Sequence, residues 1–516
     1  MNSRDKSIIV RQYFHTLFFT CIKIAATISL IYLIGKNLHP SENSDYALIR
    51  SSIEIGTYIL GMDIYVFLGR YIPGRPRAES IRMFKSVFVL ELAIALFICG
   101  VLLVTGLDLA IARSINIANT GLFRLGIAML LVGAVSTELM RLFRALRMIE
   151  VSNIVNFLRT HSWIFILLVM WAMGTRIDLA WIMGFWFAGL IISGLYGLVK
   201  LGLLDFLRAP MDTGVYRRAI SFVWPIYLST AGAILTGYLD IFILSILRTP
   251  EETGIYAYAK SIVIVGILFT ATMTEDVLAP HIVASYNRRE SALASRLLSG
   301  LLKYALVTVV FFIVLFGLSS KEVLTILAKP GYLAATSFIP ILLLATFIRT
   351  LTIPMRQVLL LKERVRLLSA IDISGAVITL SLTLALVERF SMTGAALALV
   401  FSNTFVAVAM TKSAGPYKLF SFMDAKVPGV LAAGGLSGAL LFGIHYMVTP
   451  FYETGDGLHA LIVFSIMAVS FAVIYAAALL VFRVLDGADV TRMMDFFTDL
   501  CRSVWNRARI FERDSL

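Results

Sequence analysis

The sequence predicts an all-α polytopic membrane protein with about fourteen transmembrane helices, arranged as two pseudo-symmetric six-helix lobes followed by two C-terminal helices. Three observations predict this class. Of the 516 residues, 59% are apolar and 15% are charged, whereas soluble domains are about 45–50% apolar and about 25% charged. The apolar residues form runs of about 20 residues, the length a helix needs to cross the hydrocarbon core. Basic residues collect in every second loop.

The apolar runs define the expected helices in order. Their ranges are 16–35, 46–69, 87–106, 121–141, 154–174, 179–199, 219–246, 255–277, 301–318, 335–355, 367–387, 393–410, 428–448 and 458–482. These runs are far longer than the tilted strands of a membrane barrel, so helices are expected. The first run is too long for a signal-peptide core and lacks a clear small-residue cleavage site, so we expect it to be retained. Pro225 and Pro340 interrupt helices seven and ten, where a bend is expected.

The helix pattern divides the chain into four parts. We expect an N-terminal lobe at 1–200, a C-terminal lobe at 201–425, two additional helices at 426–485 and a cytoplasmic tail at 486–516. The tail is amphipathic, which predicts a helix lying on the membrane surface or, as an alternative, a helix that docks on a partner protein. The other connections are too short to hold a folded domain.

The charges of the loops predict the orientation. The loops after helices two, four, six, eight and ten are expected to carry most of the cations. Their basic residues are Arg70, Arg75, Arg77, Arg82, Lys85, Arg141, Arg144, Arg147, Arg159, Lys200, Arg208, Arg217, Arg218, Arg288, Arg289, Arg296, Lys303, Arg356, Lys362, Arg364 and Arg366. Because cytoplasmic loops collect Lys and Arg, both termini are expected in the cytoplasm. Orientation also accounts for the net charge of +13 without a nucleic-acid partner.

The sequence contains an internal repeat. Residues 40–56 (PSENSDYALIRSSIEIG) match residues 250–266 (PEETGIYAYAKSIVIVG) without gaps, and both are interpreted as loops entering an even-numbered helix. The identical pairs are Pro40/Pro250, Glu42/Glu252, Tyr46/Tyr256, Ala47/Ala257, Ser51/Ser261 and Gly56/Gly266, and Arg50 aligns with Lys260. A repeat of six helices predicts two halves related by an axis along the membrane normal, with a binding site between them. Chance similarity in a biased composition is the alternative.

Four cations fall within predicted helices and are the candidates for substrate binding: Lys23, Arg50, Lys260 and Arg349. An ionisable residue inside a membrane helix costs about 2.5–3.5 kcal/mol on insertion scales, so it tends to face a cavity or a partner. Cations in a cavity could pair with phosphate oxygens, and Arg is suited to bidentate contact. The alternative is that each side chain extends to the nearest interface.

Two acids are candidates for coupling transport to H⁺ or Na⁺. Glu54 follows Arg50 by four residues, so the two can pair on one helix face. Asp240 lies about two turns inside its helix, and a hydroxyl or Lys260 could equally satisfy it as a structural group. The remaining helix acids, Asp63, Glu91 and Asp372, are expected near cytoplasmic ends and in contact with water.

The sequence predicts no enzyme chemistry. It has no P-loop and no His-Glu-x-x-His motif. Its three cysteines have no disulfide or metal spacing, and its six histidines are scattered. We therefore expect no catalytic residue, no metal site and no cofactor beyond a coupling ion.

Two stretches resemble a known family. Residues 237–262 (GYLDIFILSILRTPEETGIYAYAKSI) and 61–75 (GMDIYVFLGRYIPGR) are similar to the polysaccharide transporter, or Wzx-like flippase, branch of the multidrug/oligosaccharidyl-lipid/polysaccharide (MOP) exporter superfamily. The resemblance implies two lobes around a central cavity, alternating access, and a place in the bacterial inner membrane. It implies an oligosaccharide on undecaprenyl pyrophosphate (an O-antigen, exopolysaccharide or capsule repeat unit) as cargo. Membrane lipids, a polysaccharide polymerase and chain-length proteins are the implied partners.

The resemblance also implies that cations from helices one, two and eight line the cavity, where Lys23, Arg50 and Lys260 occupy comparable places. Three other functions remain open. A drug-efflux antiporter of the same superfamily would favour acids in its cavity, because its substrates are cationic. A membrane glycan polymerase or ligase would need a large external loop, and every external loop here is short. A flippase for the peptidoglycan precursor would differ only in cargo.

Overall fold

A computed structural model describes residues 3–61, 64–72, 75–417, 419, 421–448 and 457–485, and its regular elements within these ranges are all helices. The elements are α1 Ser3–Asn37, α2 Pro40–Gly61, α3 Ile64–Tyr71, α4 Arg77–Thr105, α5 Leu107–Ser114, α6 Thr120–Ala145, α7 Ile149–Thr160, α8 Ser162–Ala172, α9 Leu179–Leu201, α10 Leu203–Arg208, α11 Thr213–Leu247, α12 Pro250–Asn287, α13 Ser291–Leu318, α14 Ser320–Leu327, the 3₁₀ helix η1 Pro330–Ser337, α15 Ile339–Leu351, α16 Ile353–Leu361, α17 Val365–Ala414, η2 Gly415–Tyr417, α18 Val427–Val448 and α19 Gly457–Val481. Asp63 and the tail at 486–516 lie outside the described residues.

The protein is a multi-pass membrane protein with the expected number of spans. Within the described ranges, ten helices are long and apolar enough to cross a membrane, and the bent pairs α2 with α3 and α7 with α8 bring the number to twelve. The 50-residue α17 is a hairpin of two spans, because its backbone breaks at Ser391 (φ 49°) and Thr379 of its first half bonds Ser402 of its second half. With the 38-residue α12, the count reaches the fourteen that the sequence predicts.

The repeated segments are helix starts, which corrects their interpretation as loops. α2 begins at Pro40 and α12 at Pro250, six and five residues earlier than expected. Proline suits the first turn because its missing N–H needs no partner there. The glutamate two residues later accepts a hydrogen bond from the backbone N–H of the residue before the helix. Glu42 accepts from His39 N at 2.8 Å, and Glu252 accepts from Thr249 N at 3.3 Å. Pro340 likewise begins α15 and does not bend a helix, and α11 continues through position 225.

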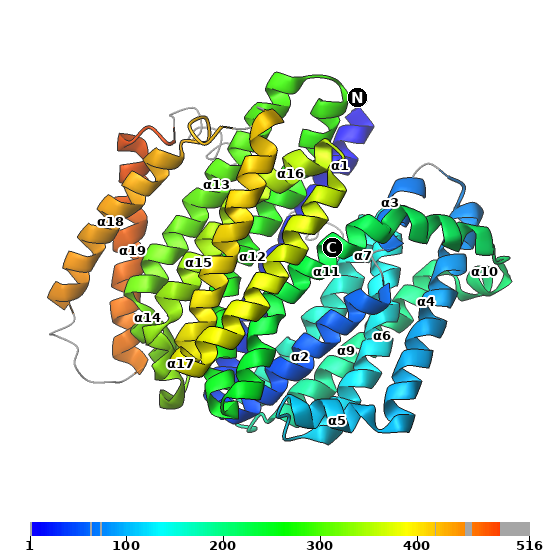
Figure 1. The fold of residues 1–516 in the computed structure, drawn as a ribbon, viewed down its shortest axis with the longest axis horizontal. Helices are drawn as coiled ribbons and strands as arrows, with labels where there is room; N and C mark the ends of the chain where they lie inside the picture. Colours follow the sequence, from blue (N-terminus) through cyan, green and yellow to red (C-terminus); the bar gives the residue numbers. More distant parts are fainter. Residues whose placement is uncertain are drawn as a thin grey trace, which may run out of the picture.

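The helices form two groups that join on one side of the membrane. Figure 1 shows α2–α10 grouped on one side of the molecule, α12–α17 on the other, and α18 and α19 at the far edge. We call the ends of the helices that carry the Arg-rich loops the basic face, and the other ends the opposite face. Near the opposite face, Leu48, Ile127, Tyr256 and Phe338 belong to one apolar core shared by both groups. Near the basic face, one core joins α3, α4 and α6 with the start of α11, and a separate core joins α12, α13, α16 and α17.

Candidate functional site

The two repeat-related helices cross beside the opposite face. Buried Asn43 of α2 donates from Nδ2 to the carbonyl of Gly254 in α12 at 2.7 Å. A Cβ on Gly254 would lie 1.7 Å from the carbonyl oxygen of Pro40, so only glycine permits this approach. The sequence repeat therefore brings its own two copies into contact, between the two groups of helices.

A small polar pocket of about 90 Å³ lies directly beside this crossing. Its walls come from α1, α2, α11 and α12, and they include both Arg50 and Lys260. The aligned pairs Ala47/Ala257 and Ser51/Ser261 line the same pocket. Positions that match in the repeat thus face one shared space.

Lys260 and Asp240 form a buried ion pair, which is the structural alternative that the sequence analysis left open for Asp240. Lys260 Nζ lies 2.6 and 2.7 Å from the two oxygens of Asp240 and donates to the Gly237 carbonyl at 2.7 Å. The Tyr256 hydroxyl donates to Asp240 Oδ2 at 2.6 Å. Asp240 is fully buried and the Lys260 side chain is 12% exposed. A phosphate would have to compete with Asp240 for this ammonium, which the low dielectric makes costly.

Arg50 is more open than Lys260. Its Nε donates to Glu54 Oε1 at 2.9 Å, as the four-residue spacing predicts, and the side chain remains 44% exposed. The other oxygen of Glu54 accepts from the Tyr238 hydroxyl of α11. Arg50 can therefore reach an anion without breaking a fully enclosed pair.

A larger cavity of about 450 Å³ joins the two groups of helices at the centre of the molecule. Glu54 and Tyr58 line it from α2, Lys260 from α12, and Arg349 from α15. A second space of about 290 Å³ shares Ala233, Thr236, Thr346, Arg349, Arg356 and Asn403 with it. We call the two spaces together with the small polar pocket the central chamber. Its walls hold Arg50, Lys260 and Arg349, three of the four predicted cations.

Arg356 is a chamber residue that the sequence analysis missed. It was assigned to a basic loop, but Pro354 starts the new helix α16 and carries Arg356 into the wall. Arg356 Nη2 pairs with Asp372 Oδ2 at 2.5 Å, and the Ser229 hydroxyl donates to the same oxygen at 2.5 Å. Asp372 is 5% exposed, so its expected contact with water is wrong. The pairing of α16 with α17 buries it.

Lys23 and Arg159 lie on the N-terminal side. Lys23, half-buried in α1, lines neither of the two larger spaces and lies near His161. Arg159 is another correction: it lies in α7, not in a loop, and donates to Thr137 Oγ1 at 2.7 Å and Asn156 Oδ1 at 3.2 Å. Its buried Nε has no hydrogen-bond partner within the described residues. Its position inside the apolar run 154–174 is the sequence signal that could have assigned it to a helix.

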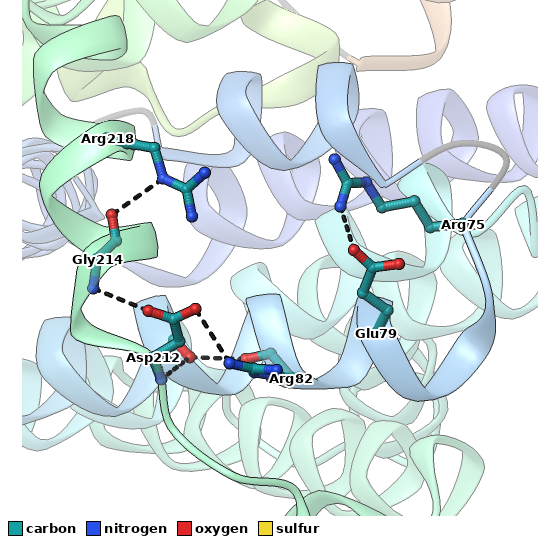
Figure 2. Close-up of polar contacts among 7 residues, drawn as sticks. Arg75, Glu79, Arg82, Asp212, Gly214 and Arg218 are labelled. Carbon is teal, nitrogen blue, oxygen red and sulfur yellow. Dashed lines mark hydrogen bonds and ion pairs between the residues drawn. The ribbon is translucent and has the colours of Figure 1, made fainter.

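Other cations of the basic face bind the segment between α9 and α11, which links the two lobes. Figure 2 shows Arg82 of α4 paired with Asp212 at 3.2 Å, while Asp212 caps α11 by accepting from Gly214 N at 3.0 Å. Lys85 donates to the carbonyls of Leu207 and Ala209 at 2.7 Å. These cations fix the linker that enters α11. Among the described residues, no group of three or more His, Cys, Asp or Glu could hold a metal ion.

No family model matches the sequence, and no curated protein sequence matches it. Solved structures do match. Lipid II flippase MurJ in an inward closed conformation aligns with a TM-score of 0.67 over 91% of this chain and 100% of that chain, at 11% identity. An inward-facing multidrug resistance MATE family transporter aligns at 0.62 over 77% and 94%, at 14% identity. A MOP superfamily transporter from Pyrococcus furiosus aligns at 0.54 over 79% and 95%, at 11% identity.

These similarities define the class of protein: the chain has the fold of the MOP superfamily transporters. The resemblance inferred from residues 61–75 and 237–262 is confirmed at the level of the fold.

Proposed function

We propose that this protein is a flippase that moves an undecaprenyl-pyrophosphate-linked oligosaccharide across the bacterial inner membrane by alternating access. The observation that supports the proposal is the central chamber, whose lining includes Arg50, Arg349 and Arg356. A pyrophosphate cannot cross hydrocarbon unaided, and Arg offers planar donors that match phosphate oxygens. The prenyl tail would remain in the lipid while the head group passes through the chamber.

The charge of the chamber favours a lipid phosphate over a cationic drug. A drug-efflux antiporter, the alternative to which the similarity to a multidrug resistance transporter points, would be served by acids in the chamber. Here the acids are engaged: Glu54 bonds Arg50 and Tyr238, and Asp372 bonds Arg356. The matched MurJ structure is a lipid II flippase, and the peptidoglycan precursor is therefore the second candidate cargo for this chain.

The proposal is tested with the double variant Arg50→Gln/Arg349→Gln in a strain that depends on this gene. Each charge-assisted hydrogen bond is worth about 1.5–3 kcal/mol, so two losses should slow translocation about 100-fold or more. Surface polysaccharide should disappear, and the lipid-linked sugar should accumulate in the cytoplasmic leaflet. Arg113→Gln, an exposed cation of α5, is the matched control and should export normally.

Lys260 is left unchanged in this test because its removal would strand the buried Asp240. Normal export by the double variant at wild-type protein levels would refute the cationic chamber as the binding site. If the double variant is lethal and the peptidoglycan precursor accumulates, that precursor is the cargo of this protein. Sensitivity of the variant to cationic drugs alone would instead assign drug efflux.

A further inference from the structure

Glu91 is a buried acid that the central chamber does not use. It lies at the middle of the 29-residue α4 and is 6% exposed. Neither of its carboxyl oxygens has a hydrogen-bond partner among the described residues. The sequence placed it near a cytoplasmic end in contact with water, and that expectation is wrong because α2 and α6 cover it.

Glu91 lines a small space of about 20 Å³. Glu138 of α6 and Thr57 of α2 line it as well, and the other walls are apolar, including Phe88 and Leu92. A space of this size holds one water molecule. The Thr57 hydroxyl donates to the Ile53 carbonyl at 2.7 Å.

The charged groups around this space form a set of three. Glu138 Oε1 accepts from Arg141 Nη1 at 2.7 Å, and both side chains are largely buried. From α3, Tyr65 holds the Arg141 guanidinium 4.2 Å from its ring centre. Tyr216 of α11 is a further titratable group near Glu91. Glu91 therefore lies beside an ion pair in which it takes no part.

An unpaired ionised carboxylate in this space would cost several kcal/mol or more, whereas a protonated carboxyl avoids that penalty. A metal cation would need several oxygen ligands, and one water plus these few oxygens do not provide them. We propose that Glu91, with the Glu138–Arg141 pair, is a proton-binding site in the N-terminal lobe that couples proton movement to transport. This inference rests on the proposed transport function and supplies its coupling ion.

The site is connected to the central chamber through Arg141. When Glu91 loses its proton, it competes with Glu138 for Arg141, whose guanidinium also lies 5.9 Å from the ring centre of Tyr58. Tyr58 lines the chamber one turn beyond Glu54 on α2. A Cβ on Gly61 would lie 3.5 Å from both Arg141 Nη1 and Glu138 Oε1, so α2 packs directly on the pair. Proton release would thus shift the helix that carries Arg50.

The first test needs no substrate. The full chain in lipid nanodiscs is titrated while infrared difference spectra record the C=O band of protonated carboxyls. We expect a band that is lost in Glu91→Gln, is shifted but retained in Glu91→Asp, and is unchanged in Glu290→Gln, an exposed acid at the start of α13. The same band in Glu91→Gln as in the wild type would overturn the proposal.

The second test uses proteoliposomes containing lipid-linked oligosaccharide, with an imposed pH or Na⁺ gradient. We expect the pH gradient to stimulate wild-type translocation several-fold, and Glu91→Gln to translocate without responding to it. Stimulation by Na⁺ alone would overturn the proton assignment. If no lipid-linked sugar moves in any protein while the Glu91 band is present, the proposed cargo fails and the proton site stands.

Discussion

At the scale of single residues, ion pairing decides which predicted cation is available to a ligand. Lys260 and Arg50 occupy matched places in the repeat, yet Lys260 is enclosed with Asp240 while Arg50 keeps an open side. The Asp240 partner lies twenty residues earlier, on α11, and Glu54 lies on the same helix as Arg50. Pseudo-symmetric positions thus contribute one structural pair and one accessible guanidinium.

The buried pair makes a prediction about stability. Asp240→Ala should destabilise the protein by about 3–5 kcal/mol, because it leaves the Lys260 ammonium buried without its partner. Asp240→Leu/Lys260→Met removes both charges and should recover most of that loss. Thermal unfolding of the two variants in the same detergent measures the difference. Equal melting temperatures for Asp240→Ala and the wild type would contradict the enclosed pair.

At the scale of helices, the crossing of α2 and α12 defines the junction of the lobes. The capped starts at Pro40 and Pro250 fix where the two helices begin, and Asn43 ties them together. The hairpin of α17 depends on a comparable approach: a Cβ on Gly394 would lie 2.3 Å from the Leu386 carbonyl oxygen. Close backbone contact, more than polar pairing, holds these helices in place.

The crossing is tested by Gly254→Ala. The added methyl group meets the Pro40 carbonyl, so the helices must separate and the yield of folded, monodisperse protein should fall sharply. Gly184→Ala in α9 is the matched control, because its Cβ meets nothing within 4 Å. The control should be neutral or stabilising by up to about 1 kcal/mol. Size-exclusion profiles compare the two, and a wild-type profile for Gly254→Ala would argue against this helix contact.

At the scale of the whole molecule, the apolar cores near the opposite face differ from those near the basic face. One apolar core joins both lobes near the opposite face. Near the basic face, the core of α3, α4 and α6 includes the start of α11 and is separate from the core of α12, α13, α16 and α17. The chamber extends toward the basic face as far as Ile353 and Arg356. If the basic face is cytoplasmic, a chamber that extends toward it is what an inward-facing state of the proposed alternating-access cycle requires.

Cysteine labelling tests this conformation. In a chain with its three native cysteines replaced, Thr346→Cys in the chamber should react with a membrane-impermeant maleimide added at the basic face and not at the opposite face. Arg289→Cys and Arg113→Cys report the basic and opposite faces respectively. Labelling of Thr346→Cys from the opposite face only would reverse the assignment.

The sequence by itself determined the helical class, the fourteen spans, the repeat and the cations of α2, α12 and α15, because each depends on local hydropathy, charge or capping. Tertiary structure alone decided which groups pair: Lys260 with Asp240, Arg356 with Asp372, and the enclosure of Glu91. The physical reason is that lipid-facing and core-facing positions of these helices are both apolar. The sequence of a helix therefore gives little indication of which face is buried. Contacts between distant helices make that choice.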